Sequence, residues 1–185
     1  MKFSLNTAEV FIPDGAPEEQ ALGRTTHLCI AAHQDDIEIM AAQPIVECFQ
    51  QANAWFTGVV VTDGRGSPRD SLYKEYTDDE MRAVRFHEQR KAAYGGEFAA
   101  QVMLDIPSAI IKDASRPDPV DDLVKLLRAT KPQSVYTHNF ADKHDTHVAV
   151  ASRVVEAIRR LEQAERPERL VGCEVWRSLD WMVDT

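Results

Sequence analysis

The segment AHQDDIEI places one His and two adjacent Asp directly after a short apolar run. Two neighbouring carboxylates repel each other, and a bound cation removes that repulsion. His33 and Asp36 are three residues apart, so a tight turn can direct both side chains to one point. Imidazole and carboxylate are ligand types of a catalytic zinc site, so this segment predicts part of a metal centre.

A second segment, HDTH, carries His144 and His147. At the start of a helix, this spacing puts both side chains on one face. Two His and one carboxylate, with an open position for water, form a catalytic zinc arrangement. Asp35, next to a ligand, is then placed to take a proton from the bound water, and the remaining His is suited to stabilise an oxyanion. The spacing alone leaves open which of the two histidines binds the metal.

Strands that alternate with helices must position these two segments. Apolar runs predict strands at 27–32, 54–62, 98–107, 133–138 and 169–176. Helical spacing of apolar residues and a capping-box pattern (Thr77 with Glu80) predict helices over 37–52, 77–93, 119–130 and 144–164. The alternation predicts an α/β fold with a mostly parallel sheet and helices on both faces. Residues 1–24 are interpreted as a lead-in strand or arm followed by a loop.

The carboxyl ends of parallel strands explain how two distant segments can meet. In open α/β sheets, ligands bind in the crevice beyond those ends. The first segment directly follows the strand predicted at 27–32, and residues 138–147 follow the strand predicted at 133–138. If both strands are parallel, the two segments lie at the same edge of the sheet.

These motifs resemble the PIG-L/LmbE-like de-N-acetylase family. Its signature AHPDDE or AHPDDIEIG is matched by AHQDDIEI, and its later HxDH motif by HDTH. Between them, TDGRGS (62–67) and RFHEQRKAAYGG (85–96) look like the family's Thr/Gly-rich loop and R-x-x-E motif. The resemblance spans about residues 27–150. The chain departs from the pattern where Gln34 replaces Pro and Thr146 replaces Asp, and where MAA stands in place of a Gly-rich stretch.

The resemblance implies a role for each polar residue of the two motifs. His33, Asp36 and His147 would bind zinc, with Fe²⁺ as the other candidate metal. Asp35 would act as the general base. His144 would act as the electrophile and as general acid to the leaving amine.

The resemblance also implies the fold and the activity. The fold would be Rossmann-like with three layers, and the chain, residues 1–185, would be one PIG-L/LmbE-like domain that is short at its C-terminus. The activity would be zinc-dependent removal of an acetyl group from an N-acetylglucosamine-type sugar or conjugate, with metal-bound water as the nucleophile. Two alternatives stay open: a metal-binding relative without catalysis, or with a regulatory role, and a metal-dependent esterase. No GxGxxG motif follows the first strand, so no dinucleotide cofactor is expected.

Composition narrows the choice of partners and compartment. The net charge of -9 disfavours nucleic acid and anionic membrane surfaces. No signal peptide and no stretch of ~20 apolar residues is present, so a cytoplasmic protein with a small-molecule partner is expected. The three cysteines are widely spaced without a CxxC motif, which indicates free thiols in a reducing compartment. The sequence leaves a homo-oligomer open.

Other conspicuous side chains receive structural interpretations. Glu38 is interpreted as a first-turn acid that interacts favourably with the helix dipole. His138 is interpreted as a polar residue at a strand end that can line the pocket. Trp55, Trp176 and Trp181 are interpreted as packing residues of the core or its edge.

Overall fold

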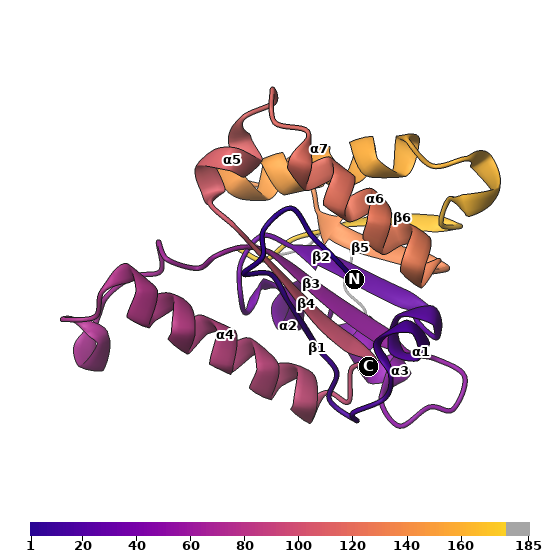
Figure 1. The fold of residues 1–185 in the computed structure, drawn as a ribbon, viewed down its shortest axis with the longest axis horizontal. Coiled ribbons are helices and arrows are strands. Elements are labelled where there is room, and N and C mark those ends of the chain that lie inside the picture. The colour runs from indigo at the N-terminus through magenta and orange to yellow at the C-terminus, as the bar shows by residue number, and fades with distance from the viewer. Residues whose placement is uncertain (177–185) are drawn as a thin grey trace.

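A six-stranded sheet forms the centre of the computed structural model, which describes residues 1–176 (Figure 1). The strands are β1 (Glu9–Phe11), β2 (His27–Ala31), β3 (Phe56–Thr62), β4 (Ala100–Ile106), β5 (Ser134–His138) and β6 (Arg169–Cys173). Their order is β1-β4-β3-β2-β5-β6, and every neighbouring pair is parallel except β1 with β4. The mostly parallel sheet predicted from the sequence is confirmed.

Helices cover both faces of this sheet (Figure 1). They are α1 (Glu18–Gly23), α2 (Asp36–Met40), α3 (Ala42–Cys48), α4 (Asp78–Gly95), α5 (Ser108–Lys112), α6 (Asp118–Thr130) and α7 (Asp145–Arg159), with short 3₁₀ helices at Ser71–Tyr73 and Gln163–Glu165. Buried side chains of α1, α5, α6 and α7 share one hydrophobic cluster, and those of α2, α3 and α4 share another. The three-layer α/β architecture is therefore present. None of the helices in the described range is long and apolar enough to cross a bilayer.

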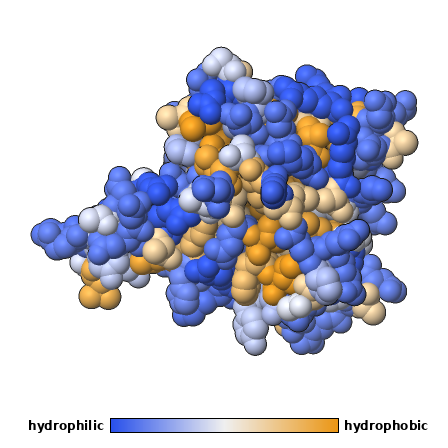
Figure 2. All heavy atoms as spheres, viewed as in Figure 1, coloured by the Kyte–Doolittle hydropathy of each residue, from blue (hydrophilic) through white to orange (hydrophobic). Residues whose placement is uncertain are grey.

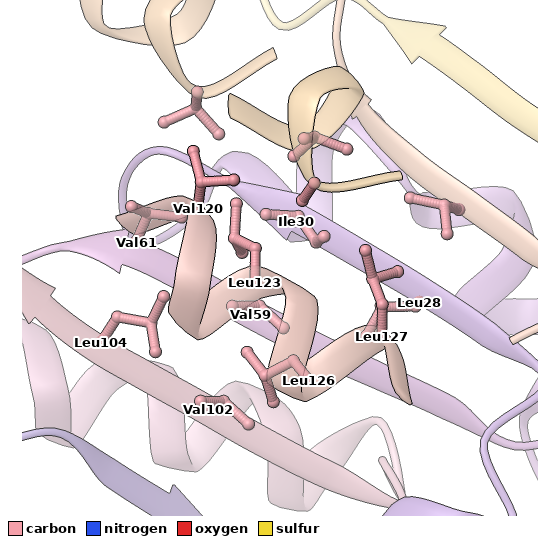
Figure 3. Packing of buried hydrophobic residues seen from close by; sticks show 14 of the residues in the cluster. Leu28, Ile30, Val59, Val61, Val102, Leu104, Val120, Leu123, Leu126 and Leu127 are labelled. Carbon is pink, nitrogen blue, oxygen red and sulfur yellow. The ribbon is translucent and has the colours of Figure 1, made fainter. Parts of the chain in front are cut away.

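Successive residues of each central strand point to opposite faces of the sheet and so enter different cores. Leu28 and Ile30 belong to the cluster under α6, whereas Cys29 and Ala31 belong to the cluster under α2 and α4. Figure 3 shows alternate side chains of β2, β3 and β4 pointing toward the leucines of α6. Figure 2 shows hydrophilic side chains over α4 and the outer helices, with apolar ones gathered in the middle of the view. Both faces of the central strands are buried under helices, so these strands form continuous apolar runs in the sequence.

Replacing Leu126 by Ala tests this core. Leu126 lies on α6 and is fully buried, so its truncation leaves a cavity under the helix. The free energy of unfolding is expected to fall by about 2–5 kcal/mol in urea denaturation. Leu72→Ala is the matched control, because that side chain is 87% exposed and its loss should change stability by less than about 0.5 kcal/mol.

Several predicted boundaries are wrong, and each has a local cause. The helix predicted over 37–52 is two helices, broken at Ala41, because Pro44 has no N–H to donate to the carbonyl of Met40. Two short helices, α1 and α5, were not predicted. The last helix ends at Arg159 rather than at 164, and β6 ends at Cys173 rather than at 176. The capping box that opens α4 is confirmed.

The sheet has a topological switch point between β2 and β5. From β2 the chain adds β3 and β4 on one side, and then returns to add β5 and β6 on the other. The two strands at the switch point pair in parallel, with His27 opposite Ser134 and Ile30 opposite Thr137. Crossover connections leave in opposite directions there, which opens a crevice beyond the carboxyl ends. Both motifs singled out in the sequence begin at this crevice.

Candidate metal centre

Three side chains predicted as metal ligands meet at the switch point. His33 Nδ1 lies 3.1 Å from His147 Nε2, and Asp36 Oδ2 lies 3.3 Å from the first atom and 3.4 Å from the second. His33 follows β2, Asp36 opens α2, and His147 lies in the first turn of α7. The fold thus brings together two histidines that are 114 positions apart in the sequence.

The spacing of these three atoms fits a tetrahedral metal ion. Zinc–nitrogen and zinc–oxygen bonds of about 2.0–2.1 Å place two ligands of a tetrahedron roughly 3.3–3.4 Å apart. The observed separations of 3.1, 3.3 and 3.4 Å agree with that figure. Three protein ligands leave one coordination position open, as catalytic sites require. The residues present can therefore hold a divalent metal.

Asp36 is held in the ionised form that a metal requires. Its side chain is almost fully buried, and its Oδ2 accepts a hydrogen bond from the His33 N–H at 2.8 Å. Burial alone would raise the pKa of Asp36. The contacts with His138 and His33, and the nearby His147, outweigh burial and hold the pKa of Asp36 well below its usual range. The same backbone hydrogen bond closes the turn that directs His33 and Asp36 to one point.

His147 is oriented by a buried carboxylate. Asp142 Oδ2 lies 2.9 Å from His147 Nδ1, and both side chains have no exposed surface. Burial and the neighbouring His138 lower the pKa of His147, despite Asp36 and Asp142, so its imidazole is neutral. The contact with Asp142 assigns the proton to Nδ1 and leaves the Nε2 lone pair free toward the other two ligands. No motif in the sequence indicated this role for Asp142.

His138 lies behind the centre as a buried polar residue at the end of β5. Its ring stacks on His147, with centroids 3.9 Å apart and planes 15° from parallel. Its Nε2 accepts a hydrogen bond from the Ala32 N–H at 2.9 Å and lies 3.4 Å from Asp36 Oδ2. The strand-end interpretation is confirmed. Asp36, His138 and His147 also form a compact group with all ligand atoms within 4.8 Å.

Asp35, the predicted base, stands at the open side of the turn. Its φ of 73° is left-handed, a conformation that Asp tolerates better than most residues. Arg85 Nη2 donates to Asp35 Oδ2 and to the Gln34 carbonyl, both at 2.7 Å, and Gln89 Oε1 accepts from the Asp35 N–H at 3.3 Å. The Asp35 side chain is 65% exposed. Helix α4 therefore fixes this carboxylate while leaving it accessible.

Glu38 has a larger structural role than the interpretation as a first-turn acid gives it. Gln89 Nε2 donates to Glu38 Oε1 at 2.8 Å and to Gln101 Oε1 at 3.2 Å. Burial, together with the charges of Asp35 and Asp36, raises the pKa of Glu38. This buried chain of polar groups links α2 to α4 and β4, and it braces the turn that carries the ligands.

Gln34, which replaces the family's Pro, is accommodated by the Gly-rich loop. Its side chain is 1% exposed, and a Cβ atom at Gly64 would lie 2.6 Å from its Oε1. Gly64 also has a φ of 71°, which favours glycine. The TDGRGS segment therefore leaves room for the Gln34 amide beside the turn.

His144 is the N-cap residue of α7 and lies beside the ligand set. Its ring centroid is 5.0 Å from that of His33 and 4.6 Å from that of His147. The Thr146 N–H donates to His144 Nδ1 at 3.2 Å. Because Nδ1 accepts this hydrogen bond, a neutral His144 carries its proton on Nε2. The Nε2–H group can then donate a hydrogen bond to a bound substrate. His33, His144 and His147 also lie close enough to share a metal, so the geometry alone admits His144 as a ligand.

Trp176 was interpreted as a packing residue of the core or its edge, and it does not belong to the core. The side chain is 49% exposed, and its ring lies 6.4 Å from the His144 ring and 5.8 Å from the His147 ring. Trp55 is partly buried under the Arg24 guanidinium, as packing predicts. Trp181 lies outside the described residues. No residue spacing in the sequence signals this position for Trp176, because the pairing of β6 with β5 brings it beside the centre.

The comparisons with known proteins agree with the geometry. A family model described as GlcNAc-PI de-N-acetylase, PIG-L, matches residues 28–158. Among solved structures, N,N'-diacetylchitobiose deacetylase from Pyrococcus horikoshii is 22% identical with a TM-score of 0.61, over 73% of this chain and 49% of its own. The A40926 pseudoaglycone deacetylase Dbv21 is 20% identical with a TM-score of 0.55, over 74% and 60%. No curated protein sequence matches significantly.

A third structural relative has a different activity in its name. GalB, the 4-carboxy-2-hydroxymuconate hydratase from Pseudomonas putida KT2440, is 20% identical with a TM-score of 0.64, over 80% of this chain and 62% of its own. At these identities the likeness establishes the fold alone. The chain spans about half the length of the chitobiose deacetylase. The family match includes both motifs and most of the chain, and on that match the chain belongs to the PIG-L family of GlcNAc-PI de-N-acetylases.

Proposed function

We propose that this protein is a zinc-dependent hydrolase that removes the acetyl group from an N-acetylglucosamine-type sugar or conjugate. The observation that carries the proposal is the triangle of His33 Nδ1, Asp36 Oδ2 and His147 Nε2, with sides of 3.1–3.4 Å, at the topological switch point. When bound there, the metal supplies Lewis acidity that polarises an acyl oxygen and lowers the pKa of coordinated water. Membership of the PIG-L family supports the acetamide as the bond that is cleaved.

Asp35 acts as the general base in this proposal. It adjoins the ligand Asp36 in the chain, its carboxylate is accessible, and Arg85 and Gln89 hold it from α4. A base must come within hydrogen-bond reach of the proton that it removes, and the position of Asp35 next to Asp36 in the chain supports this role. The proton taken by Asp35 is then available for the leaving amine, so this proposal gives Asp35 the general-acid step that the resemblance implied for His144.

His144 acts as the oxyanion donor. The backbone contact at its Nδ1 leaves the Nε2 proton free to point at a developing negative charge. Its ring lies beside the ligand set, with its centroid 5.0 Å from that of His33 and 4.6 Å from that of His147. Thr146, which replaces the family's Asp, contributes its backbone N–H to this arrangement.

Release of acetate from N-acetylglucosamine and from N,N'-diacetylchitobiose tests the proposal. Purified protein containing one equivalent of Zn²⁺ or Fe²⁺ is incubated with each sugar, and acetate and free amine are measured together. Equal amounts of both products support an amide hydrolase. p-Nitrophenyl acetate serves as the ester arm, since ester cleavage without amide cleavage would favour an esterase. Metal bound with neither activity would instead favour a non-catalytic relative.

Replacing Asp142 by Asn tests the orientation of His147. The amide can no longer act as a charged acceptor for the His147 Nδ1–H, so the affinity for Zn²⁺ should fall roughly 10–100-fold in a competition titration with a chelator. Asp145→Asn is the matched control. That carboxylate is exposed, pairs with Lys112 and does not orient a ligand. Equal zinc affinity in both variants would contradict the role given to Asp142.

A further inference from the structure

An exposed tryptophan lies against the two histidines of α7. The Trp176 ring is 5.8 Å from the His147 ring and 12° from parallel with it, and 6.4 Å from the His144 ring and 6° from parallel. About half of the side chain is exposed. Tryptophan is enriched at interfaces, because its large ring offers an apolar face for contact while its polar N–H can reach water. Trp176 lies beside His147, a predicted metal ligand, and His144, the predicted oxyanion donor. This position indicates that the indole contacts the substrate.

The backbone that carries Trp176 is anchored to the site. Glu174 Oε1 accepts hydrogen bonds from the Val175 N–H at 3.2 Å and the Trp176 N–H at 2.9 Å. Asn139, which directly follows β5, donates from its side chain to the Cys173 carbonyl at 3.0 Å. These contacts tie the end of β6 to the loop that leads into α7. The position of the indole is therefore set by the same elements that position His144 and His147.

We propose that the Trp176 ring is the platform on which the pyranose ring of the substrate stacks, and thus a specificity-determining residue. The proposal rests on the proposed deacetylase function and names the part of the substrate that this residue recognises. The face of an indole carries partial negative charge, and the axial C–H groups of a pyranose form an apolar face that suits it. The sugar's hydroxyls remain at its edge, where water and polar side chains reach them.

The dimensions of an N-acetyl sugar suit this placement. With bonds of about 1.3–1.5 Å, the acetyl carbon of a 2-acetamido sugar lies roughly 4 Å from the centre of the pyranose ring. The indole centroid lies 5.8 Å from the ring of the ligand His147. A sugar on the indole can therefore extend its acetamide to the metal centre while its ring stays outside. An acetylated amine without a ring would gain nothing from Trp176.

Lys143 also contacts this platform. Its ammonium lies 4.8 Å from the Trp176 ring centroid, and the side chain is exposed. A cation over an exposed ring is a weak interaction, and the long lysine chain can move aside for a ligand. A planar carboxylate could also use an indole with a neighbouring ammonium, so such a compound belongs in the test as a rival occupant.

Ligand-observed NMR tests the platform. Methyl N-acetyl-β-glucosaminide is titrated into the full chain carrying Asp35→Asn, so that turnover does not consume it, with Trp176 intact or replaced by Ala or Phe. Saturation transfer should be strongest at the protons of one pyranose face. The dissociation constant should rise roughly tenfold in Trp176→Ala and largely recover in Trp176→Phe. Trp55→Phe, a matched change at a distant tryptophan, should bind normally, and circular dichroism confirms that each variant is folded.

Each outcome decides the proposal separately from the function. Equal affinity in Trp176→Ala, or no binding of the sugar to the chain with Trp176 intact, overturns the platform. Muconate, a planar dicarboxylate, is titrated in the same way as the rival occupant, and its binding in place of the sugar, dependent on Trp176, also overturns the platform. If one of these results is obtained and the protein without substitutions still releases acetate, the platform is rejected and the deacetylase function is retained. If sugar binding depends on Trp176 but no acetate is released, the platform stands and the hydrolase fails.

Discussion

Replacing Asp35 by Asn is expected to lower the rate of acetate release by roughly 10²–10⁴-fold while the metal stays bound. The amide is nearly the same shape, but it cannot accept a proton. Asp35 contributes no atom to the triangle of His33, Asp36 and His147, so metal content should be unchanged. Acetate release and elemental analysis on the same preparation measure both quantities.

Glu88→Gln is the matched control for that experiment. Arg85 contacts Glu88 Oε2 through Nη1 at 2.7 Å and Asp35 Oδ2 through Nη2 at the same distance. The control therefore removes one carboxylate from Arg85 and leaves the proposed base intact, and its activity should stay near that of the unmodified protein. If Asp35→Asn keeps full activity, the base has been assigned wrongly. If both variants lose activity equally, the arginine cluster rather than the base is responsible.

The strands could be predicted because a parallel sheet buries both of its faces. Every residue of β3 is buried, so the segment FTGVVVT forms a continuous apolar run in the sequence. Helix α1 could not be found in the same way. It has six residues and buries only Ala21 and Leu22, too few to establish a helical period. The apolar positions between 37 and 49 do have that period. The pattern therefore predicted one continuous helix and did not show the break that Pro44 causes.

The metal ligands could be predicted because each motif is local and both follow parallel strands. The Asp142–His147 contact could not be, because it joins a loop residue to a ring whose orientation depends on the packing of α7 against β5. The buried link between Glu38 and Gln89 joins two helices that no sequence pattern pairs. Residues that form the centre were visible in the sequence, whereas most residues that hold it in place were not.

Replacing His147 by Ala is expected to reduce the metal content from about one ion per chain to near zero. His147 supplies one vertex of the ligand triangle, and its ring also separates the buried carboxylates of Asp36 and Asp142. Without that ring, Asp142 loses its imidazole partner and Asp36 loses one of its three, so the variant should also be less stable than the unmodified protein. Elemental analysis and thermal unfolding, each with and without added Zn²⁺, measure the two effects.

His87→Ala separates loss of a ligand from loss of any histidine. That side chain is exposed on α4, so metal content and stability should both stay unchanged. Added Zn²⁺ should raise the unfolding temperature of the His87 variant and of the unmodified protein, but not that of His147→Ala, because binding to the folded state alone produces stabilisation. If His147→Ala keeps one metal per chain, then His33 and His144 are the histidine ligands instead. That set is compatible with their proximity, and it would leave His147 with a packing role.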